Sequence, residues 1–119
     1  MLTRDESLPK NEILKSNADF KKIIYSGRRI DKRFISVYSL KSFPPARKVG
    51  FIVAKRIGKA HIRNKIKRRM REIYRKNRYR MTEGSYIIIR AKNGIDGIKY
   101  TELEGEITAG LKHAGLINA

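Results

Sequence analysis

The segment from Ile62 to Arg75 constrains the fold of this chain more than any other, because it places apolar and cationic residues on opposite faces of one predicted helix. At about 100° per residue, an apolar stripe is formed by Ile62, Ile66, Met70, Ile73 and Tyr74. The opposite face carries Arg63, Asn64, Lys67, Arg68, Arg71 and Arg75. Such a helix must dock on the rest of the domain through its apolar stripe, and it then presents a row of cations to solvent.

Acidic residues that could neutralise this row are nearly absent. Glu72 is the only acid between Lys55 and Arg80. A solvated helix face usually alternates Glu and Lys four residues apart, because like charges at that spacing repel each other. Here the residues at that spacing are all cations: Arg63, Lys67, Arg71 and Arg75. This pattern favours a polyanionic partner over an ordinary solvated surface.

The charge of the whole chain supports the same interpretation. It has 29 Lys and Arg against 11 Asp and Glu, a formal net charge of +18. From Glu83 onward the five acids outnumber the four bases, so the positive field comes from the first two thirds of the sequence. A charge of this size indicates a nucleic-acid partner but says nothing about the fold.

Length and residue types exclude several classes of protein. With 119 residues, of which 40% are hydrophobic, residues 1–119 form one predicted domain with a modest core. No apolar run approaches the roughly 20 residues of a membrane span, and no hydrophobic signal segment is present, so we expect a cytoplasmic protein without a membrane partner. The chain has no Cys, and its two histidines, His61 and His113, lie far apart outside any motif. We therefore expect no metal site built by the protein and no Ser-His catalysis.

Hydrophobic periodicity and capping residues predict the order α-β-β-α-β-α after a loose N-terminal arm at residues 1–15. The predicted elements are a helix from Ser16 or Asn17 to Gly27, strands Phe34–Leu40 and Lys48–Lys55, a helix at about Lys59–Arg78, a strand Gly84–Ala91, and a last helix from Thr101 with a Thr101–Glu104 capping box. The fold class is α+β, with helices expected on one face of a small sheet. The basic helix is then the crossover between two strands that can lie parallel.

Four blocks of the sequence, in order, resemble the bacterial ribonuclease P protein component over about residues 14–110. They are NADFKKIIYSG, FISVYSL, KRIGKA with the following Arg63-Asn64, Lys67-Arg68 and Arg71-Glu72 pairs, and GSYIIIRA. The resemblance implies an α+β fold like that of a ribosomal-protein domain, a small mixed sheet with helices. It also implies a left-handed βαβ crossover through the basic helix, although about 98% of parallel crossovers are right-handed.

The resemblance also implies a function. Proteins of this family are the protein subunit of the ribonuclease P ribonucleoprotein, an endoribonuclease whose RNA subunit carries the chemistry. They bind this catalytic RNA and the 5′ leader of precursor tRNA, and they assist the Mg²⁺-dependent removal of that leader. The metal ions are bound mainly by the RNA subunit and the substrate, and the protein alone is expected to be a monomer.

Two other function classes stay open at this point. A ribosomal protein or RNA chaperone, with no enzymatic partner, would share the charge and the fold. Composition cannot separate this class from a ribonuclease P protein, but the four matching blocks can. A self-sufficient nuclease would need a cluster of metal-binding acids or a His pair, which the chain lacks.

Carried over to this sequence, the resemblance assigns no catalytic residue and two groups of binding residues. The RNA-binding group is Arg63, Asn64, Lys65, Lys67, Arg68, Arg71 and Arg75. The leader-binding cleft takes Phe20, Tyr38, Lys55 and Arg56. Phe20 and Tyr38 could be platforms on which bases stack or ordinary core residues, whereas Phe34 and Phe51 are expected in the core. Lys65 stands where the family often has a second Arg, and Ile24 stands where some members have a second aromatic residue.

Overall fold

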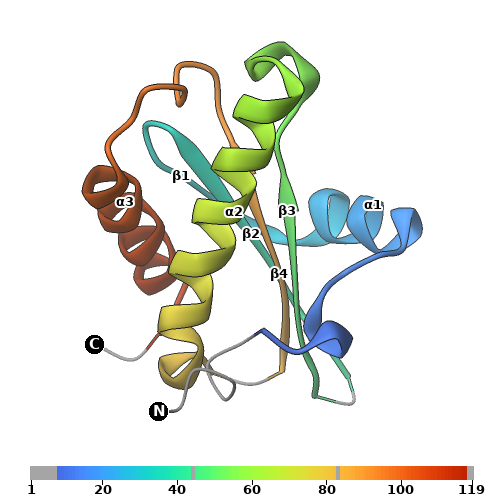
Figure 1. The fold of residues 1–119 in the computed structure, drawn as a ribbon. Coiled ribbons are helices and arrows are strands. Elements are labelled where there is room, and N and C mark those ends of the chain that lie inside the picture. The colour runs from blue at the N-terminus through green and yellow to red at the C-terminus, as the bar shows by residue number, and fades with distance from the viewer. Residues whose placement is uncertain (1–7, 44, 83, 118–119) are drawn as a thin grey trace.

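The computed structural model describes residues 8–43, 45–82 and 84–117. Three helices and four strands follow one another along the chain (Figure 1). They are α1 (Asn17–Ser26), β1 (Arg28–Asp31), β2 (Ile35–Lys41), β3 (Arg47–Ile52), α2 (Ala60–Asn77), β4 (Ser85–Ala91) and α3 (Tyr100–His113). Three short 3-10 turns are η1 (Lys10–Glu12), η2 (Lys55–Ile57) and η3 (Arg78–Arg80). No helix among the described residues has the length and apolar character needed to cross a lipid bilayer.

The four strands form one mixed sheet in the order β1-β2-β4-β3. β3 and β4 pair in parallel, while the other two neighbouring pairs are antiparallel. Viewed from the α2 side with β3 and β4 pointing upward, as in Figure 1, β4 lies to the left of β3. The β3–α2–β4 crossover is therefore left-handed, as the family resemblance implies and against the general preference for the other hand.

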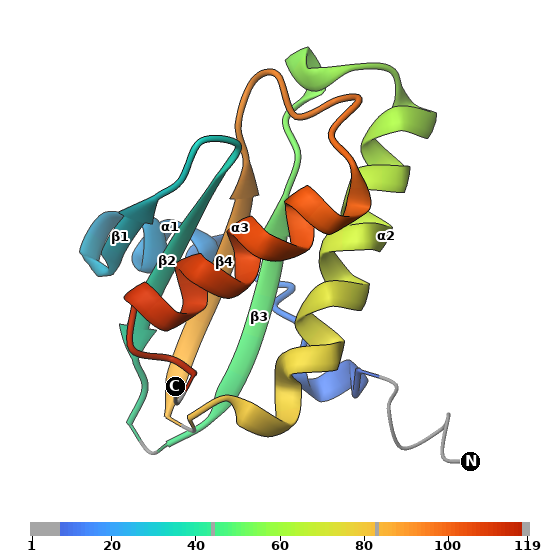
Figure 2. The ribbon, with the colours of Figure 1, turned by 90° about the vertical axis from the view of Figure 1, so that its left-hand side faces the viewer.

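The helices cover both faces of the sheet, so the prediction that they cover one face was wrong (Figure 2). Val37, Ile87 and Ile89 point into the larger core beneath α2 and α3. Their neighbours Tyr38 and Ile88 point to the opposite face and form a smaller core beneath α1. Because side chains alternate along a strand, apolar residues at successive positions of β2 and β4 require a cover on each side.

The sequence pattern located most elements to within two residues but missed β1. Three of the four β1 residues are charged and exposed, so no apolar alternation marks this edge strand. The strand predicted to reach Lys55 ends at Ile52, and Lys55–Ile57 form η2 instead. The side chain of Ser16 caps α1 as predicted, accepting a hydrogen bond of 3.4 Å from the Asp19 amide. No side chain caps α3, because that helix begins at Tyr100 and Thr101 lies inside its first turn.

The predicted loose arm is packed over its second half. Residues 8–15 are described, and they settle on the domain, an outcome that the sequence left open. The Leu14 side chain is buried, and its amide donates a hydrogen bond of 2.8 Å to the carbonyl of Val49 in β3. Ile13 makes an isolated parallel bridge to the same residue. Residues 1–7 lie outside the described part of the chain.

Close contact between α1 and the sheet depends on Gly50 in β3. A Cβ atom added to Gly50 would lie 2.5 Å from two ring carbons of Phe20 and 3.3 Å from Cβ of Leu14. The absence of a side chain therefore allows the Phe20 ring to lie directly against the β3 backbone. The distance between α1 and β3 therefore depends on the absence of a side chain at Gly50.

Gly50→Ala should destabilise the protein by about 1–3 kcal/mol, because the Phe20 ring must move to make room for the methyl group. Urea denaturation followed by circular dichroism measures this change. Gly105→Ala is the matched control, because no heavy atom lies within 4 Å of its added Cβ and the residue is exposed in α3. This control should gain about 0.5–1 kcal/mol from helix propensity. A Gly50→Ala variant as stable as the wild type would contradict the close packing.

Candidate nucleic-acid interface

The cationic face of α2 is presented to solvent as predicted. We call the group Arg63, Asn64, Lys67, Arg68, Arg71 and Arg75 the basic ridge. Asn64, Lys67, Arg68 and Arg71 are exposed, whereas Arg63 and Arg75 are half-buried. The buried residues of the helix include Ile66, Met70, Ile73 and Tyr74, which pack into the larger core. The apolar stripe and the ridge therefore divide the helix as its periodicity predicts.

The ridge is not neutralised by its surroundings. None of Arg63, Lys67 and Arg71 has an ion pair with a carboxylate of the described residues, and neither has Arg68. The one acid on the helix, Glu72, accepts a hydrogen bond of 2.7 Å from the Tyr100 hydroxyl, which lowers its pKa. Arg63, Lys67, Arg68 and Arg71 are therefore available to an external anion.

Lys65 lies apart from the rest of the predicted RNA-binding group. It is exposed on the flank of α2 that faces the 95–100 loop, and there it lines a groove with Arg69. Arg68, Arg71 and Arg75 instead line a second groove, against Leu8 and Ile13 of the N-terminal segment. Cations thus flank α2 on two sides rather than forming a single row.

A network of ionic contacts holds the N-terminal segment beside the ridge. Glu12 of η1 accepts two hydrogen bonds from the Arg78 guanidinium, one of them 3.0 Å from Nε to Oε1, and its Oε1 lies 3.3 Å from Nε of Arg47. The exposed fractions of these three side chains are only 14–20%. The Arg78 hydrogen bond is the main cause of a Glu12 pKa below its ordinary value of 4.5. Glu12 therefore fixes residues 8–13 to β3 and to the end of α2.

A second cationic surface lies on the face of the sheet that packs against α1. Its pocket of about 400 Å³ is lined by Arg29, Arg33, Ser36, Arg56, Arg90, Lys92 and Asn93, with Ala91. We call it the cationic pocket. Ser36 pairs with Arg90 across β2 and β4, two residues along from the Tyr38–Ile88 pair under α1. Period-two alternation places both pairs on the same face, so the pocket continues the surface that α1 covers.

Asp31 organises one side of the cationic pocket. Its carboxylate accepts hydrogen bonds from the Ser36 hydroxyl and, at 3.0 Å, from Nε of Arg29, and these contacts lower its pKa. Across the pocket, Nε of Arg56 donates a hydrogen bond of 3.0 Å to Oδ1 of Asn93. Asp31 therefore contacts two of the five cations, Arg29 and, at 3.9 Å, Lys92, and does not balance the charge of the group.

The structure separates the four residues predicted for the leader cleft. Arg56 lines the cationic pocket, and Lys55 is exposed beside it in η2. Phe20 is half-buried against Gly50, so part of its ring remains accessible. Ile24, one helical turn further on, is likewise half-buried against the smaller core.

Of the two interpretations that the sequence left open for Tyr38, the structure supports the core residue and not the stacking platform. Its side chain is 2% exposed in the core beneath α1, and the Arg29 guanidinium lies over its ring, 5.5 Å from the centroid. Tyr38 lies in β2, a central strand of the sheet, and its side chain packs against α1. Phe51 is buried as predicted and contacts Tyr74 edge to face, and Phe34 packs half-buried against the larger core.

Sequence reasoning missed four cations of this pocket: Arg29, Arg33, Arg90 and Lys92. They are scattered in the sequence, and only strand pairing brings them together. A weak signal existed at Arg90, a cation that interrupts the apolar strand SYIIIRA on the Tyr86 and Ile88 face. That interruption indicates where the cover of the sheet ends.

The described residues do not fit a metal ion bound by the protein. No group of three or more His, Cys, Asp or Glu side chains among them is placed to hold one. Glu12, Asp31 and Glu72 each contact basic or hydroxyl groups instead. We therefore derive no metal chemistry from this chain.

Comparisons with known proteins give one consistent result. The family model for ribonuclease P matches residues 8–115. The chain is 34% identical over 106 residues to the ribonuclease P protein component of Alkaliphilus oremlandii, with 89% of this chain and 93% of the relative covered. A Clostridium novyi protein with the same description is 30% identical, with 93% and 100% covered.

Solved structures agree with the sequence relatives. The Staphylococcus aureus RNase P protein aligns with a TM-score of 0.84 and 28% identity, covering 90% of this chain and 98% of that one. The Thermotoga maritima RNase P protein aligns with a TM-score of 0.78 and 25% identity, covering 86% and 96%.

Glu12→Gln should lower the free energy of unfolding by about 1–3 kcal/mol at neutral pH, because it leaves Arg47 and Arg78 without a carboxylate. The pKa of Glu12 in the folded protein lies below its ordinary value of 4.5. The ionised carboxylate therefore stabilises the folded state at pH values above 4.5, and this stabilisation is lost as the pH falls through the pKa of the folded state. The wild type and the variant should therefore converge in stability at acidic pH. Urea titrations between pH 3 and pH 7 measure this.

The matched control for Glu12→Gln is Glu102→Gln, an exposed residue of α3 with no ion pair among the described residues. The free energy of unfolding of the Glu102→Gln variant should follow that of the wild type across the pH range. A constant difference between Glu12→Gln and the wild type down to pH 3 would argue against the ionic network.

Proposed function

The chain belongs to the ribonuclease P protein family, whose members are subunits of an endoribonuclease of tRNA processing, and on this premise we propose that it binds a catalytic RNA and the 5′ leader of precursor tRNA. One observation carries the proposal. The basic ridge projects at least four cations from a helix anchored in the core, and none of these four has a carboxylate ion pair among the described residues. A rigid row of unpaired cations suits the phosphates of a folded RNA.

The ridge supplies the contact with the RNA subunit. Asn64 at its start could hydrogen-bond to a base edge, while the Arg and Lys side chains bind phosphates and fix the position of the protein. Glu12 supports this surface indirectly, because it holds the N-terminal segment beside Arg68 and Arg71.

The cationic pocket and Phe20 supply the contact with the leader. Single-stranded RNA without sequence preference is held by a positive groove together with aromatic surfaces. Arg56 belongs to the pocket, and Lys55 to the same short turn, which leads directly into α2. A leader strand in the pocket would therefore run close to RNA bound on the ridge. Arg29, Arg33, Arg90 and Lys92 join the predicted Lys55 and Arg56 in this role.

The division of labour follows from the side chains present. The protein provides cations and the Phe20 ring, and the RNA subunit provides the hydrolytic centre. We assign the Mg²⁺ ions to the RNA and the substrate, and we propose that the free protein is a monomer that works in the cytoplasm. Cations of the protein near the substrate would reduce the number of Mg²⁺ ions needed to screen phosphates.

Reconstitution tests the proposal. The purified protein should not cleave precursor tRNA alone, and with a bacterial ribonuclease P RNA it should lower the Mg²⁺ concentration needed for cleavage. A ribosomal protein or RNA chaperone would bind RNA without this specific effect. Cleavage by rigorously RNA-free protein, or no change in the Mg²⁺ requirement, would refute the proposal.

Replacing Arg68 and Arg71 with Ala should weaken binding to the catalytic RNA and flatten its salt dependence. The slope of log affinity against log salt should fall by roughly 0.7–0.9 for each phosphate that the protein no longer neutralises. Filter binding at several salt concentrations measures both effects. A double variant of Lys15 and Lys112, exposed residues on other parts of the chain, is the charge-matched control and should keep the wild-type slope.

Phe20→Ala should reduce the preference for precursor tRNA over mature tRNA by about 1–3 kcal/mol while leaving affinity for the catalytic RNA nearly unchanged. The removed ring is the half-buried aromatic side chain that lies against β3 at Gly50. Tyr25→Ala is the control, because Tyr25 lies on the same helix but is 93% exposed and outside the core beneath α1. Circular dichroism must show a folded protein in each case. Full discrimination by a folded Phe20→Ala variant would remove Phe20 from the leader site.

A further inference from the structure

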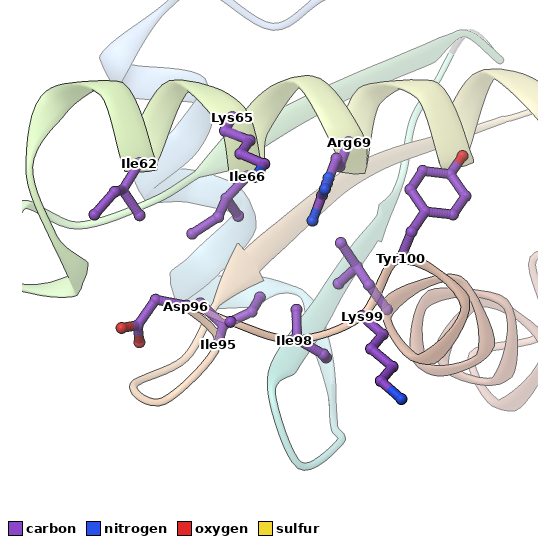
Figure 3. Close-up of a pocket in the computed structure, with 11 residues that line it drawn as sticks. Ile62, Lys65, Ile66, Arg69, Ile95, Asp96, Ile98, Lys99 and Tyr100 are labelled. Carbon is purple, nitrogen blue, oxygen red and sulfur yellow. The ribbon is translucent and has the colours of Figure 1, made fainter.

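A groove separates the first half of α2 from the segment that leads into α3 (Figure 3). It encloses about 550 Å³, within the range of roughly 300–1,000 Å³ that small-molecule sites occupy. Its walls are mainly isoleucine side chains, with Ile62 and Ile66 from α2 and Ile95 and Ile98 from the loop. The hydrogen bond from Tyr100 to Glu72 joins the two walls beside the groove.

Three cations line this apolar groove: Lys65, Arg69 and Lys99. Arg69 is half-buried and extends from α2 into the space between the walls (Figure 3). No side-chain hydrogen bond or ion pair joins any of the three to another described residue. The Lys99 side chain points away from α2, so Lys65 and Arg69 are the cations that face the groove (Figure 3).

The nearest candidate partner for Arg69 is engaged elsewhere. Glu72, three residues further along α2, accepts the Tyr100 hydroxyl and lies 4.0 Å from the Lys76 ammonium. Asp96 also lines the groove, but it points away from Arg69 (Figure 3). A guanidinium that is half-buried against apolar walls without an anion is costly, and an external anion would relieve that cost.

We propose that this groove binds one unstacked nucleotide of a folded RNA. The base lies between the isoleucine walls, and the flanking phosphates lie on Lys65 and Arg69. Unpaired nucleotides of folded RNA are commonly splayed out and bound in this way, because their flat faces pack on apolar or aromatic side chains. The combination of apolar walls and these two cations complements a nucleotide better than an apolar protein segment, which would leave Arg69 unpaired.

This inference rests on the proposed function, since the RNA in question is the catalytic RNA. It adds a contact on the flank of α2 away from the groove that Arg68 and Arg71 form with the N-terminal segment. α2 would then be held between two RNA contacts, one made by phosphates alone and one by a nucleotide with its base.

Two variants separate the base contact from the phosphate contact in filter binding to a ribonuclease P RNA. Arg69→Gln should weaken binding and lower the salt slope by roughly 0.7–0.9, the value for one phosphate. Ile62→Ser should weaken binding about fivefold or more without changing the slope, because it removes apolar contact and no charge. Lys22→Gln, at an exposed position of α1, is the control and should bind like the wild type. Circular dichroism and thermal melting verify folding, and Arg69→Gln removes no core side chain.

Cross-linking identifies the nucleotide. Because the chain has no Cys, an Asp96→Cys variant can carry a single photoactivatable aryl azide at the edge of the groove. Cross-links should concentrate on one unpaired nucleotide of the RNA, and adding Ile62→Ser should reduce their yield. Cross-links spread over paired regions, or wild-type affinity in both groove variants, would overturn the inference.

The outcomes also distinguish this inference from the proposed function. If the Arg68 and Arg71 double variant weakens RNA binding while the groove variants do not, the groove inference fails and the proposed function stands. If the wild-type protein does not bind the RNA at all, both fail.

Discussion

The two central strands, β2 and β4, bury side chains on both faces of the sheet, and this requirement determines where each helix lies. Val37 and Ile89 need the cover that α2 and α3 provide, and Tyr38 and Ile88 need the cover that α1 provides. A helix committed by its apolar stripe to one face must direct its opposite side to solvent. The basic ridge is therefore held rigidly because the core beneath it is closed. The cationic pocket lies on the part of the other face that α1 leaves uncovered.

The sequence was sufficient to predict α2, three strands and the α+β class, because amphipathic and β-branched runs carry their own signal. It could not reveal β1, an edge strand with three charged residues, or the cationic pocket, whose residues only the pairing register brings together. The position of Tyr38 stayed open for a related reason, since an aromatic residue in a strand fits both a buried and an exposed position. Apolar residues at consecutive positions of β4 did exclude a sheet with one solvated face. Combined with the amphipathic first helix, that pattern would have placed α1 over Tyr38.

Acidic and basic residues have different roles in this domain. Glu12 joins the N-terminal segment to Arg47 and Arg78, and Glu106 accepts a hydrogen bond of 2.8 Å from the Phe34 amide. Asp31 and Glu72 likewise orient neighbouring side chains. The carboxylates thus act within the fold, and the surplus of cations faces outward. Self-repulsion among those cations opposes the compact state, so the ion pairs that remain inside matter more than their number suggests.

The two open edges of the sheet are protected by different means. At one edge, the charged residues Arg28, Arg29 and Asp31 of β1 discourage pairing with another strand. At the other, among residues 8–117 that the structure describes, β3 has a backbone partner at one point along its outer side, where Leu14 donates its amide to Val49. The segment around Ile13 therefore covers part of a strand edge that could otherwise pair with a strand of a second chain. Any shortened form that lacked this segment would expose an aggregation-prone edge, whatever its affinity for RNA.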